Sequence, residues 1–534
     1  MNSTRTLFVK AMFAIFLAGG GLLLLKPLVA SKGKEEQPTP PVVSQKTASA
    51  APSDLAKRIE KVIDAGQPSA ARWGISIISM TDGSTVYARD ADKLFTPASN
   101  MKIYTTGVAL NLLGVDYRWR TSVYANSPPA NGSIQGDLTL YGRGAPDLVA
   151  SSKDDDRGSL AKLAEDLYSR GVRSVAGDVI GDESYFRGDP LGDGWQWTDL
   201  QWYFGAEASA LSINGNEVDI NFVSAGKGDE STVMTSDTEG YVTVQNRMAL
   251  ADTRAQATIG VHRGLSDNNI EVWGEFAPNS KGFGARLSVH QPALWAAKLF
   301  VRALRTRGIQ VYGRTLSRDS REPQSQRFDP SRAVELASIE SQPLSEIAKK
   351  TNKESNNLFA ELILRTLGRE RGELVALPQG AGREIGDDEA GLAVIRLWLT
   401  RAGISTTQLA LHDGSGLSRL DLVTPETSAR LLLFLAKTNV GSAFKESLPI
   451  AGRDGTLGGR LKTVKDNVSA KTGSLTYDNA LSGYLNTSEG QLLAFSIMCN
   501  DQTGHLDSVA LIDQIVTLLV AYPKFPPENG QKNQ

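Results

Sequence analysis

The 534-residue sequence has one cysteine and four histidines, and these shortages exclude several classes of site. Cys499 cannot form a disulfide within the chain, and its apolar surroundings (AFSIMC) favour a buried, inert thiol over a reactive one. The histidines are too far apart for the HExxH motif and other short-range zinc spacings. They are His262, His290, His412 and His505. The sequence therefore predicts no metal site.

Charge of one sign is not in excess either. The chain has 57 Lys and Arg against 59 Asp and Glu, a formal net charge of -2, and no basic stripe interleaved with aromatic residues. This composition argues against a nucleic-acid partner. Nicotinamide and phosphate-loop motifs are also missing, which predicts no cofactor. With 41% hydrophobic residues the chain can fill several cores, and its length predicts two to four domains at roughly 100–200 residues each.

Only one long hydrophobic run is present, near the N-terminus. Residues 1–30 have a basic start, an uncharged stretch at 11–25 and a small-residue exit at Ala30, the pattern of a secretory signal. A membrane span needs about 20 apolar residues, so a cleaved signal is favoured over a membrane anchor, and both stay open. Residues 31–53 are rich in Pro, Ser and Ala, which predicts a linker. Either reading places the folded part outside the cytoplasm.

Local patterns divide the remainder into two regions. Residues 54–114 predict a helix, a strand hairpin and a second, buried helix. Residues 115–332 consist of short strands separated by Gly, Asp, Asn and Ser turns, whereas residues 333–525 return to helices, closing strands and a final helix. We predict one α/β domain formed by 54–114 and 333–525, interrupted by a β-rich insertion at 115–332 and followed by a tail at 526–534.

Ser99 and Lys102 lie three residues apart where the second helix is predicted to begin, just after Pro97. Helical geometry puts the two side chains on one face, about 4.5 Å apart along the axis, so the amine can reach the hydroxyl. A serine becomes a good nucleophile when a base takes its proton, and a lysine does so only when burial or a nearby cation lowers its pKa. The pair predicts a nucleophile and its base, and the alternative for Ser99 is an ordinary helix cap.

Two further motifs offer groups that such a site needs. Lys471, Thr472 and Gly473 form the only KTG triplet, in a predicted strand whose edge could hold an extended peptide and whose lysine could supply a cation. Ser355 and Asn357 lie in a break between helical patterns and offer a hydroxyl for proton relay and an amide for a substrate carbonyl. The alternative for Lys471 is a solvated strand residue. Together the three motifs predict an acyl-transfer site.

The same spellings occur elsewhere in less suitable contexts. Ser31 begins a second SxxK within the linker, and Ser212 and Ser266 begin SxN triplets in turn-rich segments. Ser, Asp and Asn are ordinary turn formers there. Context therefore selects Ser99 and Ser355.

The order SxxK, SxN, KTG resembles that of the active-site serine penicillin-binding proteins and β-lactamases. The 256 residues from Ser99 to Ser355 leave room for a large insertion after the SxxK helix, as in the D-alanyl-D-alanine carboxypeptidase/endopeptidase family, peptidase family S13, also called class C penicillin-binding proteins. GDLTLYGRGAPDL, HDGSGLSR and SAKTGSL resemble the same family, and the resemblance covers residues 54–522. It implies a serine β-lactamase/transpeptidase-like domain of class α/β, with an antiparallel sheet flanked by helices and an all-α subdomain.

The resemblance also implies roles for the motif residues. Ser99 would be acylated by the penultimate D-Ala carbonyl of a peptidoglycan stem peptide, with Lys102 as the general base. Ser355 and Lys471 would relay protons, and the backbone N–H groups of Ser99 and Ser474 would form an oxyanion hole. The peptide would be held by Asn357, Thr472, Gly473 and Ser474.

Three more positions follow from matching the motifs. Asp199 in GWQWTDLQWYF and Arg419 in HDGSGLSR look like the family's acidic and basic contacts to the side chain of meso-diaminopimelate. Phe204 would line the same pocket. The alternatives are a turn residue for Asp199 and a loop salt bridge for Arg419. Thr476 stands where some relatives carry glutamine, which leaves the preferred third residue of the stem peptide open.

The implied protein is a periplasmic serine-type D-Ala-D-Ala carboxypeptidase and DD-endopeptidase that penicillins acylate covalently. Two alternatives stay open on the same fold. One is a catalytically weak peptidoglycan-binding or scaffolding protein, and the other is a β-lactamase or esterase. The sequence also leaves an N-terminal membrane tether and a homodimer open.

Overall fold

The computed structural model describes residues 53–65, 70–150, 158–224, 231–250, 258–276, 283–323, 327–375, 384–503 and 507–524. The predicted signal at 1–30, the tail at 526–534 and, apart from Ser53, the linker at 31–53 lie outside the described residues. Within these ranges no helix combines the length and hydrophobicity that a membrane crossing requires.

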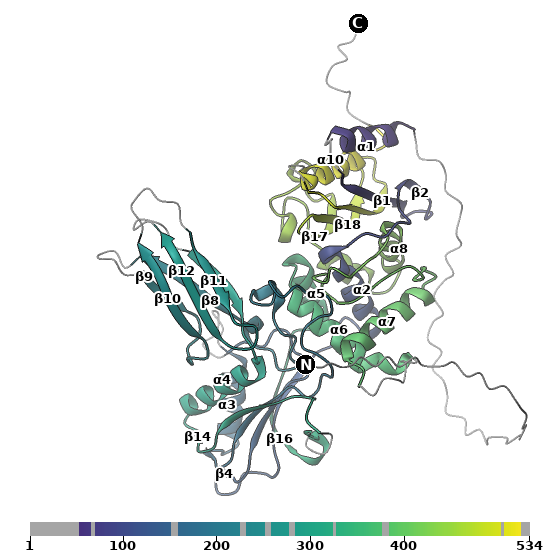
Figure 1. Cartoon of the computed structure of the whole chain (residues 1–534). Coiled ribbons are helices and arrows are strands. Elements are labelled where there is room, and N and C mark those ends of the chain that lie inside the picture. Colours follow the sequence, from purple (N-terminus) through teal and green to yellow (C-terminus); the bar gives the residue numbers. More distant parts are fainter. Residues whose placement is uncertain are drawn as a thin grey trace, which may run out of the picture. The chain divides into compact units, whose positions relative to one another are not determined.

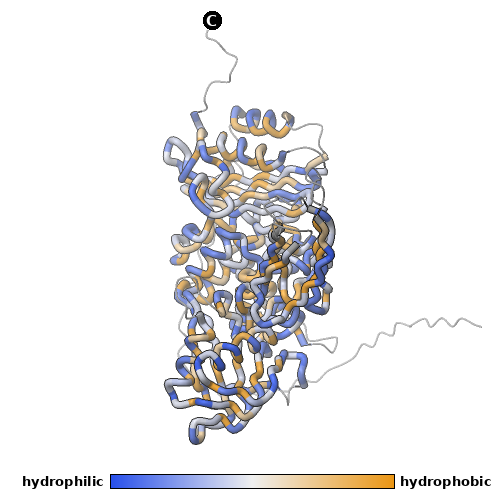
Figure 2. Tube along the Cα trace, turned by 90° about the vertical axis from the view of Figure 1, so that its left-hand side faces the viewer, coloured by the Kyte–Doolittle hydropathy of each residue, from blue (hydrophilic) through white to orange (hydrophobic). Residues whose placement is uncertain are grey.

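A five-stranded antiparallel sheet, in the order β17-β18-β19-β1-β2, forms the core of the domain that carries the motifs (Figure 1). Helices α1 and α10 cover one face, and in Figure 2 long hydrophobic segments run through the sheet beneath them. The strands are β1 (Arg72–Ser79), β2 (Thr85–Arg89), β17 (Val468–Leu475), β18 (Asp478–Asn486) and β19 (Leu492–Asn500); the helices are α1 (Ser53–Ala65) and α10 (Ser508–Ala521). Two 3-10 turns, η6 (Gly455–Leu457) and η7 (Lys462–Val464), precede β17.

A helical subdomain lies against the other face. Its central helix, α2, is buried at every residue from Met101 to Leu110, because its sequence is apolar on all sides, and it packs against α5 and α6. Helix α8 packs on β1 and β19. The elements are η1 (Ala98–Asn100), α2 (Met101–Leu113), α5 (Leu344–Lys353), α6 (Asn357–Arg371), η5 (Gly372–Leu374), α7 (Asp387–Arg401), α8 (Pro425–Leu435) and α9 (Gly441–Ser447).

The insertion has a hydrophobic core of its own, built around a mixed sheet in the order β15-β7-β5-β3-β16 and a smaller parallel sheet β14-β6-β4. The strands are β3 (Arg120–Ala125), β4 (Ser133–Ile134), β5 (Leu138–Tyr141), β6 (Ser174–Val175), β7 (Val179–Asp182), β14 (Gln310–Val311), β15 (Thr315–Arg318) and β16 (Val334–Glu340). Helices α3 (Ser159–Ser169) and α4 (Pro292–Arg307) pack together beside them. The interpretation of 115–332 as strands and turns left these two helices out.

Two three-stranded sheets complete the insertion, in the orders β10-β12-β11 and β13-β8-β9 (Figure 1). Their strands are β8 (Glu217–Ser224), β9 (Ser231–Thr235), β10 (Thr243–Leu250), β11 (Gly260–Arg263), β12 (Asn269–Phe276) and β13 (Phe283–Ser288). Three short 3-10 turns also belong to this region: η2 (Tyr203–Gly205), η3 (Asn214–Asn216) and η4 (Pro330–Arg332).

The inserted sheet continues past residue 332, where the sequence suggested that the insertion ends. Strand β16 pairs antiparallel with β3, from Val334 opposite Ala125 to Glu340 opposite Arg120. We therefore place the return to the helical subdomain after Glu340. The other domain bounds stay predictions.

Candidate active site

Ser99 lies in η1, at the start of the helix that the sequence predicted. The residue before it, Ala98, has a φ of 48°, in the left-handed region that non-glycine residues seldom adopt. Such backbone positions cluster at functional sites. Lys102, one turn later, donates from Nζ to Ser99 Oγ at 2.9 Å. The predicted hydroxyl and amine therefore meet.

Lys102 is fully buried, and its Nζ has three acceptors. Besides Ser99 Oγ, these are Asn357 Oδ1 at 2.6 Å and the carbonyl oxygen of Ser415 at 2.7 Å. Burial lowers the pKa of Lys102 to about 7, although the carboxylates of Asp413 and Glu361 oppose part of this shift. A substantial fraction of the amine is therefore unprotonated near neutral pH, as a general base requires.

A second hydroxyl and amine pair faces the first. Ser355 occupies the break between α5 and α6 with a φ of 59°, and Lys471 on β17 donates to Ser355 Oγ at 2.9 Å and to the carbonyl oxygen of Thr472 at 2.8 Å. Burial, and then the charge of Lys102, lower the pKa of Lys471 well below its ordinary value. Because two ammonium groups close together repel each other, the pair favours one charged lysine over two.

Strand β17 approaches η1 closely enough to require a glycine. A Cβ on Gly473 would lie 2.6 Å from the carbonyl oxygen of Pro97 and 2.9 Å from Asn100 Nδ2. The same Asn100 Nδ2 donates to the carbonyl oxygen of Lys471 at 3.1 Å, in a fully buried contact. The KTG strand and the SxxK turn are therefore held together by packing and by a hydrogen bond.

Ser99 opens onto a pocket of about 620 Å³. The predicted residues that line it are Ser99, Ser355, Asn357, Ser474, Asp199, Phe204 and Arg419. The other predicted residues are Lys102, Lys471, Thr472 and Gly473, which lie in the elements that carry this wall. Thr472 Oγ1 is 2.7 Å from Oγ1 of Thr456, another lining residue that the sequence did not indicate. One site thus brings together every residue singled out from the motifs.

The inserted domain supplies part of this pocket. Asn357 Nδ2 donates to the carbonyl oxygen of Phe204 at 2.9 Å, which joins the SxN motif to the insertion. Burial raises the pKa of Asp199, and the charge of Arg419 opposes that rise, so the two opposite charges interact across the pocket. Arg419 Nη1 also donates to the carbonyl oxygen of Thr476 at 2.8 Å and to Asp478 at 3.2 Å. The salt bridge considered for Arg419 is therefore present within a pocket wall.

Two buried carboxylates of the site were not predicted. Asp413 accepts from the backbone N–H groups of Ser415, Gly416 and Ser418 at 3.1, 2.6 and 2.8 Å, and thereby shapes the loop whose carbonyl contacts Lys102. Glu361 accepts from the Gly414 N–H at 2.9 Å. A lone glutamate inside the apolar run LFAELIL, four residues before an arginine, is the signal that could have identified Glu361.

Among the residues that the structure describes, no group of three or more His, Cys, Asp or Glu side chains could hold a metal ion.

Comparison with known proteins gives one consistent family. A model of the D-Ala-D-Ala carboxypeptidase 3 (S13) family matches residues 55–522. The D-alanyl-D-alanine carboxypeptidase of Actinomadura sp. strain R39 is 32% identical over 495 residues, which cover 90% of this chain and 87% of that protein. The predicted family resemblance is confirmed.

Solved structures agree. Penicillin-binding protein 4 from Haemophilus influenzae matches with a TM-score of 0.72 and 27% identity, over 87% of this chain and 99% of that chain. A structure of penicillin-binding protein 4 from the same organism in complex with a β-lactam matches with a TM-score of 0.67 and 25% identity, over 86% and 98% of the two chains. The predicted fold class is confirmed.

Proposed function

The chain belongs to the D-Ala-D-Ala carboxypeptidase 3 (S13) family, and we propose that it cleaves peptidoglycan stem peptides and their cross-links through an acyl-enzyme on Ser99. As a member of this family it is a serine-type D-Ala-D-Ala carboxypeptidase. The observation that carries the proposed mechanism is the meeting of two hydroxyl and amine pairs, Ser99 with Lys102 and Ser355 with Lys471, at one pocket.

In the proposed first half-reaction, Ser99 Oγ attacks the carbonyl carbon of the penultimate D-Ala while its proton passes to the neutral amine of Lys102. The ester C–O bond forms and the peptide C–N bond breaks. The departing amine takes a proton from the Ser355 hydroxyl, and Lys471 then gives a proton to Ser355. Backbone N–H groups of Ser99 and Ser474 hold the oxyanion, a contribution of about 2.7–4 kcal/mol per donor in comparable sites.

In the second half-reaction, water attacks the ester carbonyl carbon and gives up a proton through Ser355 to the now neutral Lys471. The C–O bond to Ser99 then breaks, and Ser99 Oγ takes back the proton that Lys102 holds. The released group decides the activity: terminal D-Ala in a carboxypeptidase reaction, or a neighbouring stem peptide in an endopeptidase reaction. A substrate bound in extended form fits the structure because β17 is an edge strand of its sheet. Residues 449–451 pair with its outer side at Val468–Ala470, and the KTG stretch that follows Ala470 is the part proposed to pair with the substrate backbone.

Asp199 and Arg419 form the proposed contacts to the zwitterionic end of diaminopimelate. Their opposite charges line the pocket that contains Ser99, with Phe204 beside them. We expect Arg419→Gln to raise KM for a diaminopimelate peptide more than for a lysine-containing peptide, because lysine keeps the amine of the zwitterion but lacks its carboxylate. Asp199→Asn should raise KM for both peptides, since both carry the amine. Equal effects of Arg419→Gln on the two peptides, or no effect of Asp199→Asn on either, would remove this assignment.

The substrate places the enzyme outside the cytoplasm, and the proposed location is the periplasm. Support comes from the signal-like pattern at residues 1–30. Penicillin inhibition is proposed on two grounds: the Ser99 nucleophile, and the β-lactam complex of the related Haemophilus influenzae protein.

The first experiment is intact-mass analysis of the protein after incubation with benzylpenicillin, beside Ser99→Ala. We expect one adduct of the mass of penicillin on the parent protein and none on the variant. Product analysis on a diaminopimelate stem peptide and on its cross-linked dimer then ranks the two activities. A folded parent protein that forms no adduct and releases no D-Ala would refute the mechanism in favour of a peptidoglycan-binding protein, while rapid loss of the adduct with penicillin turnover would favour a β-lactamase.

A further inference from the structure

The third acceptor of Lys102 is a backbone carbonyl on the loop at 413–418, and this loop depends on Asp413 for its shape. The carboxylate of Asp413 accepts from three backbone N–H groups of the loop and from Ser415 Oγ at 3.1 Å. Asp413 is almost completely buried. A shift of this carboxylate would therefore move the Ser415 carbonyl that lies 2.7 Å from Lys102 Nζ.

A segment of the inserted domain, residues 193–195, lies directly on this loop. Trp195 Nε1 donates to Asp413 Oδ2 at 2.9 Å. Gly194 has a φ of 79°, and a Cβ there would be 2.5 Å from Ser418 Oγ, so the side chains at the end of the loop leave no space for one at this position. Asp193 Oδ2 lies 2.8 Å from His412 Nδ1, just before the loop. Three successive residues of the insertion thus fix the loop from outside.

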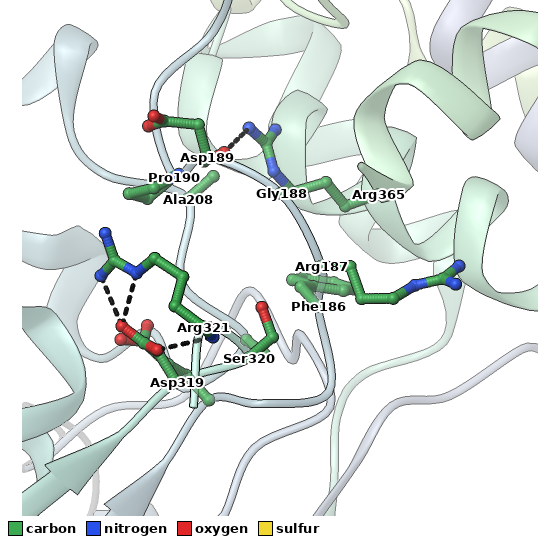
Figure 3. A pocket seen from close by; sticks show the side chains of 12 residues that line it. Phe186, Arg187, Gly188, Asp189, Pro190, Ala208, Asp319, Ser320, Arg321 and Arg365 are labelled. Carbon is green, nitrogen blue, oxygen red and sulfur yellow. Dashed lines mark hydrogen bonds and ion pairs between the residues drawn. The ribbon is translucent and has the colours of Figure 1, made fainter. Parts of the chain in front are cut away.

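A second connection approaches the same loop from the opposite side. Glu361, which accepts from Gly414 N–H, is paired with Arg365 at 2.8 Å, and both side chains are only 1% exposed. Arg365 Nη2 in turn donates to the carbonyl oxygen of Asp189 in the insertion at 3.0 Å, as Figure 3 shows. The loop is therefore held by two carboxylates, Asp413 in direct contact with the inserted domain and Glu361 connected to it through Arg365.

We propose that Trp195 is a positioning residue through which the inserted domain orients Lys102: its indole N–H fixes Asp413, Asp413 fixes the loop, and the Ser415 carbonyl fixes the amine beside Ser99. The inference rests on the proposed function of Ser99 and Lys102. It gives the insertion a part in catalysis that is separate from lining the pocket. Trp195 touches neither the reacting atoms nor the substrate in this scheme.

The charged groups facing Lys102 give the expected direction of the effect. They are Lys471 from β17, Glu361 from α6 and Asp413 from the loop, with Asp421 beside Asp413. Without the indole N–H, Asp413 relaxes and the Ser415 carbonyl withdraws. The ammonium form of Lys102 then loses an acceptor, which lowers the pKa of Lys102 further, and the amine is held less firmly against Ser99.

The test compares Trp195→Phe with Trp197→Phe in the full chain. Trp197, two residues along the same segment, has 66% of its surface exposed and serves as the matched control. We expect Trp195→Phe to acylate with benzylpenicillin about tenfold more slowly at its pH optimum, equivalent to about 1.4 kcal/mol, and the acid limb of its pH profile to move down by about 0.5 pH unit. The control should match the parent protein in both rate and profile.

Replacing Trp195 by β-(3-benzothienyl)alanine, an isostere in which sulfur replaces the N–H, covers the case in which the phenylalanine variant does not fold. This variant keeps the ring shape and removes only the donor, so we expect the same slower rate and the same shift. An unchanged acid limb in either folded variant, or equal losses at positions 195 and 197, would overturn the proposal. If the proposed function itself were wrong, the parent protein would show no adduct at all, which is a different result.

Discussion

Acidification from pH 8 to pH 5 is expected to slow the acylation of Ser99 about a hundredfold. The pKa of Lys102, lowered to about 7 by burial, sets this magnitude. A base with that pKa is about 90% unprotonated at pH 8, about half at pH 7 and about 1% at pH 5. The rate follows the unprotonated fraction because only the neutral amine can take the proton of Ser99.

The measurement is the second-order rate constant of acylation by benzylpenicillin, followed by quenching and intact-mass analysis at half-unit steps from pH 5 to pH 10. Circular dichroism at each pH checks that the fold persists, so that acid unfolding is not mistaken for titration. A profile that stays flat down to pH 5 would refute Lys102 as the titrating base. A profile still rising steeply above pH 9 would show that burial does not lower the pKa of this lysine.

Three further outcomes follow from packing and burial. Gly473→Ala should slow acylation about a hundredfold and lower the free energy of unfolding by about 1–3 kcal/mol, because the added methyl group pushes β17 away from η1. The control is Gly459→Ala, which should change neither quantity because nothing lies within 4 Å of a Cβ at that position. Equal acylation rates of the two variants would contradict the close approach of β17 to η1. Asn100→Ala should lower the free energy of unfolding in urea by about 1–3 kcal/mol, because it leaves the buried Lys471 carbonyl without this donor; an unchanged midpoint would argue against the contact. Burial raises the pKa of Cys499 to about 12, so iodoacetamide at pH 8 should modify it only in denaturant, and rapid labelling of the folded protein would disprove its burial.

The catalytic motifs were predictable because each carries a local signal. Pro97 and the apolar stretch after it predict α2. The helix in turn places Ser99 and Lys102 on one face. The break at Ser355 and the strand around Lys471 are likewise visible in the periodicity. That these three distant segments form one site followed from their complementary chemistry, and the family resemblance supported it.

Other features could not be derived in this way because they depend on contacts between distant segments. Asp413 acts on Lys102 only through the loop at 413–418, which Trp195 contacts from the inserted domain. No local sequence pattern predicts a contact between segments so far apart. Strand β16 pairs with β3, which lies more than 200 residues earlier in the sequence. The local sequence therefore could not show that β16 belongs to the inserted sheet. Helix α4 was missed for a different reason: its amphipathic pattern was present but lay within a region dominated by turns.

The central sheet joins the two ends of the folded chain. Arg72, the first residue of β1 beside the edge strand β2, is paired with Asp501, which is 429 residues away in the sequence. The insertion has a hydrophobic core of its own and can fold while later residues are still being synthesised. Strand β1, in contrast, cannot pair with β19 until β19 has been synthesised. A nascent or prematurely terminated chain therefore carries its serine without the strand that completes the site. The site is therefore complete only after the last strands of the central sheet have paired.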